Sequence, residues 1–317
     1  RRDSSLGVER TECCKGEFAV TGALPAVVED WYQRAVASPP RVVLADLGDP
    51  RADVAADRLR ADGLAVVVEP VVDLADPAMA AAVARATTAG LDPGDPVVAA
   101  AILVASGGAN AGVAGATRPS ADVIRAGLGV LGVNAGAGLV SSCFLFVLPD
   151  GRPIAYGDCG VVPDPDFEQL AAIARATATT FECLTTESAR VALLSFSTRG
   201  SATHPRVDKV RRAAEYLANT APDLASDGEL QFDAAWVPEV ADVKAPGSVV
   251  AGRANVFVFP DLDSGNIAYK ITERMGGARA YGPLLQGLDG VLHDLSRGAS
   301  ADDIVNVAVI AGLMAQD

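Results

Sequence analysis

Short apolar runs alternate with amphipathic segments in the first third of the chain. Residues 42–44, which follow Arg41, and residues 65–68 are apolar and rich in β-branched side chains. Residues 50–62 carry alanine and leucine at helical spacing among charged positions. This order predicts a strand, a short loop, a helix and a second strand, which is one βαβ unit of a largely parallel sheet.

The pattern continues with a helical stretch, a short strand over 109–115, and a helix in which Ser120 is the expected N-cap and Asp122 lies in the first turn. It then changes, because two apolar runs flank the Pro-Asp-Gly sequence of residues 149–151. Such a pattern is typical of an antiparallel hairpin. We therefore expect a domain boundary within residues 134–138.

Helices and strands alternate again beyond the hairpin. The expected elements are a helix from Asp166, a strand over 190–197, a helix from Pro205, a strand over 255–261 and a helix from Ser264. The second domain is expected to end near Gly287, and the apolar helix over 301–314 then returns to the first domain. The prediction is an α/β protein with residues 1–137 plus 288–317 as the first domain and residues 138–287 as an inserted second domain.

Composition narrows the class of ligand. The 317 residues are enough for two domains, and their net charge of -14 argues against general binding to nucleic acid or to anionic membranes. An anionic ligand therefore needs a local basic pocket. Half of the residues are hydrophobic, yet no apolar run is long enough to cross a bilayer.

Cysteine usage favours a reducing compartment. The number of cysteines is odd and their spacing does not fit a metal site, which predicts reduced thiols and a cytoplasmic location. These cysteines are Cys13, Cys14, Cys143, Cys159 and Cys183. Residues 1–20 are polar and aperiodic, and a loosely ordered end is expected there.

Two motifs have an ordinary structural interpretation beside a functional one. Gly127, Gly129 and Gly132 match the GxGxxG dinucleotide fingerprint, but a helical segment precedes them, so helix packing is the favoured interpretation. Asp261 and Asp263 follow a strand and could bind a divalent ion, although helix capping is favoured.

The two histidines of the chain, His204 and His293, lack a second ligand at a metal-binding interval and are expected to be structural or exposed. Their scarcity also makes a Ser-His-Asp or Cys-His nucleophile a poor explanation.

The loop over 195–201, with the sequence Ser-Phe-Ser-Thr-Arg-Gly-Ser, offers hydroxyls, a guanidinium and a glycine. These groups suit a small tetrahedral oxyanion such as phosphate, but an ordinary strand-to-helix turn fits them equally well.

Near the C-terminus, Ser300 and Asp303 form an S-x-x-D capping box ahead of an apolar helix. Capping accounts for Asp303 without any chemistry. It leaves unexplained an arginine held in the short glycine loop Ser296-Arg297-Gly298, beside the positive end of a helix.

The second half of the chain resembles the phosphate acetyltransferases (phosphotransacetylases) of the phosphate acetyl/butyryltransferase family. The segments that carry the resemblance are SADVIRAGL, FLFVLPDGR, DCGVVPDP, LLSFSTRGSA, DGELQFDAA, NVFVFPDLDSGNIAYKI, GPLLQGL and DLSRGASADDIVNV. They run from about Gly115 to the C-terminus. Before Gly115 the likeness is limited to residues 41–59, where the family usually has Pro-Glu-Gly in place of residues 45–47.

The resemblance implies a fold of the isocitrate/isopropylmalate dehydrogenase type, with a cleft between the two domains. It implies reversible transfer of an acetyl group between coenzyme A and inorganic phosphate. Carried over by motif, Asp303 is the base for the thiol proton, Ser296 is a hydrogen-bond partner of the reacting thiol or thioester, and Arg297 steadies the acyl phosphate. Arg125 matches a family arginine on the ligand-facing helix.

The resemblance also favours the phosphate reading of the loop, with Arg199 and Arg297 approaching the phosphate from the two domains. The residues concerned are Ser197, Thr198, Arg199, Gly200 and Ser201. It further implies no metal, no permanently bound cofactor, coenzyme A or acetyl-CoA as substrate, and a homodimer. Because no activated nucleophile is evident, direct thiolate attack in a ternary complex is expected.

The sequence is also compatible with other functions. Ala299 stands where the family commonly has Cys, and Leu292-His293 where it usually has Val-Asn. A longer acyl group such as butyryl is an alternative substrate, because the sequence does not reveal the size of the acyl pocket. A non-catalytic coenzyme A or phosphate sensor is a second alternative. An oxidoreductase is a third, but it needs an aspartate cluster and nicotinamide contacts that the sequence lacks.

Overall fold

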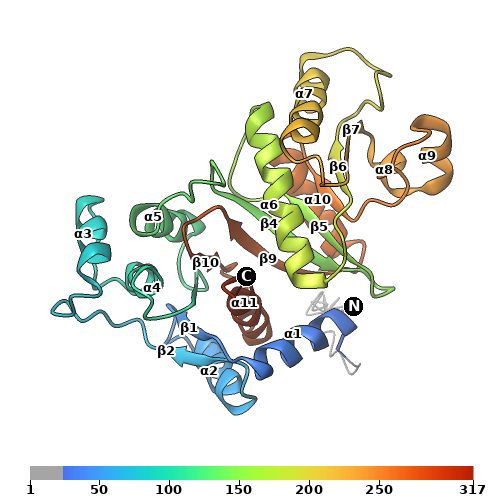
Figure 1. Ribbon diagram of the computed structural model, residues 1–317. Helices are drawn as coiled ribbons and strands as arrows, with labels where there is room; N and C mark the ends of the chain where they lie inside the picture. The colour runs from blue at the N-terminus through green and yellow to red at the C-terminus, as the bar shows by residue number, and fades with distance from the viewer. Residues whose placement is uncertain (1–23, 317) are drawn as a thin grey trace, which may run out of the picture.

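The computed structural model describes residues 24–316, which form two groups of strands and helices (Figure 1). The first group is built on a four-stranded parallel sheet with the order β10-β3-β1-β2. Its strands are β1 (Arg41–Leu44), β2 (Val66–Val68), β3 (Ala111–Ala114) and β10 (Val291–Asp294). The predicted βαβ unit is therefore confirmed, since β1 and β2 pair in parallel across a helix.

Six helices surround this first sheet in the described part of the chain. They are α1 (Ala26–Ala37), α2 (Pro50–Ala61), α3 (Ala80–Thr88), α4 (Pro96–Ala105), α5 (Ser120–Val130) and α11 (Ala301–Met314). The last helix, α11, packs against α1, α2 and β3, and most of its apolar side chains are buried. The C-terminal helix thus lies beside elements from the start of the chain (Figure 1).

The second group is built on a six-stranded sheet with the order β7-β6-β8-β5-β4-β9. Its strands are β4 (Ser141–Val147), β5 (Pro153–Gly157), β6 (Val191–Leu194), β7 (Ser226–Leu230), β8 (Val256–Val258) and β9 (Arg279–Gln286). Strand β4 runs antiparallel to both neighbours, whereas the pairs among β5, β8, β6 and β7 are parallel. The predicted hairpin is confirmed as β4–β5.

The helices of the second group are α6 (Phe167–Thr185), α7 (Pro205–Thr220), α8 (Phe232–Trp236), α9 (Pro238–Lys244) and α10 (Leu262–Arg274). Helix α10 begins two residues earlier than expected, because Asp261 caps it by accepting a hydrogen bond from the Ser264 amide (2.9 Å). This contact confirms the capping interpretation of Asp261.

The two groups meet where β9 leads into β10. Strand β10 pairs with β3, so the chain returns to the first sheet before α11 begins. Trp31 of α1 is fully buried at this junction, where its ring stands edge-on to Tyr281 (5.0 Å between centroids) and its indole Nε1 donates to the Leu184 carbonyl (2.6 Å). His293 is also fully buried, and its Nδ1 accepts from the Leu285 amide (3.2 Å).

Helix α5 corrects one prediction and confirms another. Ser120 is the first helical residue rather than the N-cap, which is Pro119, because its hydroxyl donates to Asp294 across the sheet edge. A Cβ on Gly127 or Gly129 would lie 2.9 Å from Leu288 or 2.6 Å from Leu91. These glycines therefore serve close packing, as expected. The expected loose end at 1–20 lies outside the described residues.

Candidate active site

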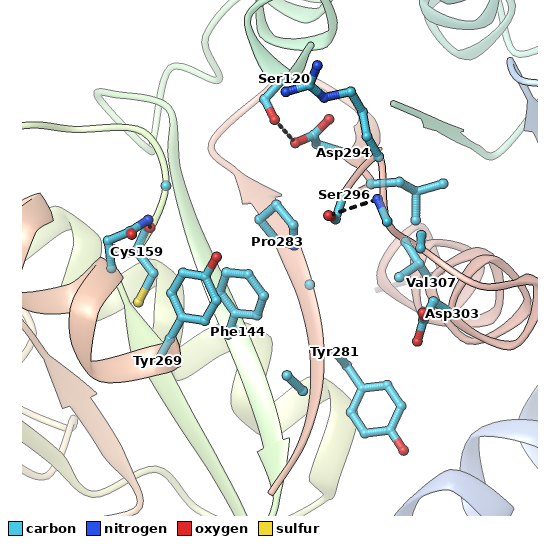
Figure 2. A pocket seen from close by; sticks show the side chains of 18 of the residues that line it. Ser120, Phe144, Cys159, Tyr269, Tyr281, Pro283, Asp294, Ser296, Asp303 and Val307 are labelled. Atoms are coloured by element: carbon cyan, nitrogen blue, oxygen red, sulfur yellow. Dashed lines mark hydrogen bonds between the residues drawn. The ribbon is translucent and has the colours of Figure 1, made fainter. Parts of the chain in front are cut away.

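A cavity of about 720 Å³ lies between the carboxyl-terminal edge of the first sheet and the β9–α10 side of the second group (Figure 2). Open parallel sheets commonly bind ligands at this edge, because the loops that follow their strands converge there. The first group contributes residues 118–120, which follow β3, Asp294 at the end of β10, and residues 295–299, which follow β10. Asp303 and Val307 of α11 complete that wall.

The turn after β10 presents Ser296, Arg297 and Gly298 to the cavity. The Ser296 Oγ accepts a hydrogen bond from the Gly298 amide (3.2 Å), which closes the turn. Asp303 lies one turn into α11 on the same wall (Figure 2). Three residues that the sequence singled out for catalysis therefore line one cavity.

The capping box predicted at the start of α11 is confirmed. The Ser300 hydroxyl accepts from the Asp303 amide (3.2 Å), and the Asp303 Oδ2 accepts from the Ser300 amide (2.8 Å). These bonds hold the carboxylate of Asp303 at the helix N-terminus without burying it. A carboxylate held in this way remains available to take a proton from a ligand in the cavity.

Arg51 of α2 donates hydrogen bonds to the turn after β10, a contact that the sequence did not indicate. Its guanidinium Nη1 donates to the carbonyls of Arg297 and Ala299 (both 2.9 Å). Its Nη2 donates to the Ala116 carbonyl (2.9 Å), and Nε donates to Asp49 (2.9 Å). One planar side chain thus joins the loops after β1, β3 and β10.

Asp46, two residues after β1, and Asp294, the last residue of β10, lie on either side of the loop that follows β3. Asp46 is buried and accepts from the amides of Ala116 and Thr117 (both 3.0 Å). Asp294 is 2 % exposed and accepts from the Ser120 hydroxyl, while its Oδ1 has no hydrogen-bond partner. Burial, with a contribution from the charge on Asp46, raises the pKa of Asp294 to about 6.

The opposite wall comes mainly from α10 and β9. Tyr269 stacks on Phe144 (4.3 Å between centroids), and both rings face the cavity (Figure 2). The cations that line the cavity as a whole are Arg118, Lys270, Arg274 and Arg297. A protein of net charge -14 therefore provides a local basic pocket, as an anionic ligand requires.

The loop over 195–201 does not line this cavity. Its donors are engaged by Glu229, which is 1 % exposed and accepts from the Ser197 hydroxyl (3.0 Å) and the Gly200 amide (2.7 Å). Burial alone would raise the pKa of Glu229, but these hydrogen bonds outweigh it and lower that pKa. Arg199 pairs with Asp227 (2.7 Å) rather than approaching Arg297.

The hydroxyls of Thr198 and Ser201 are also used inside the loop. Thr198 Oγ1 accepts from the Gln231 amide (3.0 Å), and Ser201 Oγ accepts from the Thr198 amide (3.0 Å). The buried carboxylate of Glu229 already accepts hydrogen bonds from Ser197 and Gly200 of this loop. A phosphate bound there would therefore be repelled by a negative charge.

Arg125 lies outside the main cavity on the exposed face of α5, where it pairs with Asp122 (2.9 Å). It borders a shallow depression that shares Ile124 and Val161 with the cavity. Arg125 therefore lies beside the cavity and is not among the residues that line it.

Residues 24–316 contain no group of three or more His, Cys, Asp or Glu side chains arranged to hold a metal ion. Over the same residues, no helix combines the length and apolarity needed to span a bilayer. His204 caps α7 by accepting from the Arg206 amide (3.2 Å), in line with its structural interpretation.

Comparison with known proteins gives consistent matches. The family model described as phosphate acetyl/butaryl transferase matches residues 78–312. The phosphate acetyltransferase of Acetivibrio thermocellus is 48% identical over 227 residues, which cover 70% of this chain and 68% of the relative. That of Paracoccus denitrificans is 42% identical over 308 residues, covering 89% and 97%.

Solved structures agree in fold. The crystal structure of a phosphotransacetylase from Streptococcus pyogenes superposes with a TM-score of 0.86 at 36% identity, covering 93% of this chain and 99% of the other. The EutD phosphotransacetylase of Staphylococcus aureus gives a TM-score of 0.81 at 31% identity, covering 91% and 98%.

Proposed function

The chain belongs to the phosphate acetyl/butaryl transferase family, and on that premise we propose that it transfers an acetyl group reversibly between coenzyme A and inorganic phosphate. The observation that carries this proposal is the common cavity of Ser296, Arg297 and Asp303. Its walls supply a base, a hydroxyl and several cations, which are the groups that acyl transfer to and from a phosphate needs.

In the direction of acetyl-CoA synthesis, the Asp303 carboxylate takes the proton of the coenzyme A thiol. A thiol with a pKa near about 8.5 is mostly protonated at neutral pH, so a positioned base increases the reactive thiolate. The thiolate attacks the carbonyl carbon of acetyl phosphate, the carbon–oxygen bond to phosphate breaks, and phosphate leaves. Ser296 donates a hydrogen bond to the reacting sulfur or carbonyl oxygen, and Arg297 balances the negative charge of the acyl phosphate.

The cations of the cavity are better placed for phosphate than the loop over 195–201. Arg118, Arg297 and Lys270 line the same space as the proposed base, although Arg118 also pairs with Asp95 (2.8 Å). Arg199, by contrast, is paired with Asp227 outside that space. We assign the reacting phosphate to the cavity. To Arg125, in the neighbouring depression, we assign a contact with the larger coenzyme A.

Coenzyme A and acetyl-CoA are substrates in this proposal, and no permanently bound group takes part. The transfer is direct and occurs in a ternary complex. Ser296 hydrogen-bonds a substrate and is not acetylated. Isolation of the protein with an acetyl group on Ser296 would contradict direct transfer and indicate an acyl-enzyme intermediate.

The domain division follows the same reasoning. We assign residues 138–287 to a second domain inserted into a first domain of residues 1–137 plus 288–317. Support comes from β10, which leaves the second group and pairs with β3 of the first sheet. Closing the cavity between two such domains would exclude water that could hydrolyse the acyl phosphate.

The proposal includes a homodimer in the cytoplasm. An exposed apolar stripe suits burial against a second copy. It consists of Ile267 and Ile271 of α10 and of Met275, the residue after the helix; they recur every four residues and are 58%, 52% and 83% exposed. Cys143 and Cys159 are buried thiols not joined in a disulfide, as in proteins of a reducing compartment.

The test mixes the protein with acetyl-CoA and phosphate and follows free thiol with a chromogenic disulfide. Thiol release that requires phosphate, together with acetyl phosphate as product, is expected. The same assay with butyryl-CoA measures whether the aromatic wall of Phe144 and Tyr269 accepts a longer chain. Release that is independent of phosphate would make the protein a thioesterase instead.

A further inference from the structure

Asp294 has no part in the mechanism described so far, yet it lies on the cavity wall two residues before Ser296 (Figure 2). It is among the most buried carboxyl groups of the site, and one of its oxygens, Oδ1, has no hydrogen-bond partner. An ionised carboxylate with a buried unpaired oxygen is unfavourable, because burial removes water without replacing its hydrogen bonds.

The other oxygen, Oδ2, accepts the hydrogen bond of the Ser120 hydroxyl. A serine hydroxyl has a single hydrogen to donate. While Asp294 is ionised it can only accept, so Ser120 directs its hydrogen away from the cavity that it lines. An anion in the cavity then meets only the lone pairs of Ser120.

We propose that Asp294 is a positioning residue whose protonation turns Ser120 into a hydrogen-bond donor for phosphate in the cavity. A proton taken from solvent onto Asp294 lets the carboxyl group donate to the Ser120 oxygen. The hydroxyl of Ser120 then rotates and donates its own hydrogen to a phosphate oxygen. This proposal rests on the proposed function, because it concerns the phosphate of that reaction.

The groups nearest to Asp294 favour its protonated form. Asp46 lies beyond β3, and its negative charge adds to burial in raising the pKa of Asp294 to about 6. His293, the preceding residue, has a pKa lowered to about 4 by burial, so it is neutral at pH 7 and supplies no opposing positive charge. The other charged groups around the site are Arg118, Arg297 and Asp303 on its own wall, Lys270, Glu273 and Arg274 on α10, and the Asp122–Arg125 pair on α5.

Gly115 makes this arrangement sterically possible. Its φ of +110° is a conformation that L side chains rarely adopt, and a Cβ there would collide with Asp294 Oδ1. Asp294 therefore packs directly against bare backbone, which leaves no room for a side chain that could satisfy Oδ1.

The experiment measures binding of sulfate, a tetrahedral oxyanion that does not titrate near neutral pH, unlike phosphate itself. Calorimetric titration at pH 7 in buffers of different ionisation enthalpy counts the protons taken up per sulfate bound. We expect up to about 0.9 proton per sulfate, because a group with a pKa near 6 is about nine-tenths ionised at pH 7 before binding.

Variants distinguish the coupling between protonation of Asp294 and anion binding by Ser120 from a purely structural role of the two residues. Asp294→Asn carries an amide that can donate permanently to Ser120, so it should bind sulfate at least as tightly as wild type without proton uptake. Ser120→Ala should bind sulfate about tenfold more weakly, the usual effect of losing a hydrogen bond to a charged group. Asp122→Asn, an acid on the same helix that pairs with Arg125 outside the cavity, should keep both affinity and proton uptake.

Equal proton uptake by wild type and Asp294→Asn overturns the proposal. An unchanged affinity of Ser120→Ala for sulfate also overturns it, and so does an absence of sulfate binding to wild type at millimolar concentration. Kinetics identify the anion: Ser120→Ala should raise KM for phosphate and leave KM for acetyl-CoA unchanged. The reverse would assign Ser120 to a phosphate group of coenzyme A and contradict the proposal. A protein that binds sulfate with proton uptake but releases no thiol would contradict the acetyl transfer and not this coupling.

Discussion

Replacing Gly115 by alanine tests how closely the catalytic turn depends on backbone packing. Gly115 follows β3 with a φ of +110°, and a Cβ there would lie 2.8 Å from both the amide nitrogen and the carbonyl oxygen of Leu295, besides colliding with Asp294. Real Cβ atoms do not approach backbone atoms so closely, so the chain after β10 must move. Ser296 follows at once and should move with it.

The expected loss of stability has two parts. An L side chain in this backbone conformation costs about 1–2 kcal/mol. Forcing a methyl group into a packed site costs about 1–3 kcal/mol more. The sum of about 2–5 kcal/mol should lower Tm by roughly 5–15 °C in a protein of this size, and kcat should fall because the turn is displaced.

Gly107→Ala is the matched control, since Gly107 also has a positive φ of +76° but no atom within 4 Å of the added Cβ. It should lose only the conformational part, about 1–2 kcal/mol, and keep wild-type kcat. Calorimetric melting and the thiol-release assay provide both readouts. Equal loss of Tm in the two variants, with kcat of Gly115→Ala intact, would refute the packing argument.

Three further variants probe other contacts. Arg51→Lys keeps the charge but cannot reach the two carbonyls of the catalytic turn, so kcat in the thiol assay should fall roughly tenfold or more. Arg60→Lys, on the same helix, should keep the wild-type kcat. His293→Gln tests a buried neutral imidazole: burial lowers its pKa to about 4, below about 6.5 in the unfolded chain, so its stabilisation is complete above pH 6.5 and is lost as the pH falls through 4. Urea unfolding at pH 7 and pH 5 should therefore show that the free energy of unfolding decreases less in the variant than in wild type. An equal decrease in the two proteins would contradict this. Ser197→Ala removes a hydrogen bond to Glu229 and should lower Tm while KM for phosphate stays constant; a large rise in that KM would return the loop to the active site.

Local patterns in the sequence predicted much of the fold. The capping box of Ser300 and Asp303 and the β4–β5 hairpin depend on residues close together in the chain, and both are present. Strand β10 was not predicted, because its four residues, 291–294, include His293 and Asp294, which do not form an apolar run. Its place in the sheet depends on pairing with β3, far away in the sequence.

The candidate site could be predicted only in part for the same reason. Ser296 and Arg297 were indicated by a glycine loop that capping did not explain, and they line the cavity with Asp303. Arg51 gave no signal, because an arginine in the first turn of a helix is unremarkable until its distant carbonyl partners are known. Ser120 was assigned to capping because the sequence does not show Asp294 beside it.

The central claim is that Asp303 serves as the base for acetyl transfer in this cavity. Asp303→Asn tests it most directly, since asparagine can still accept the hydrogen bond from the Ser300 amide but cannot take a proton. Phosphate-dependent release of coenzyme A from acetyl-CoA should fall by about 10²–10⁴-fold, while Asp302→Asn, at the neighbouring position paired with Arg58, should retain the wild-type rate. A wild-type rate in Asp303→Asn would contradict the claim.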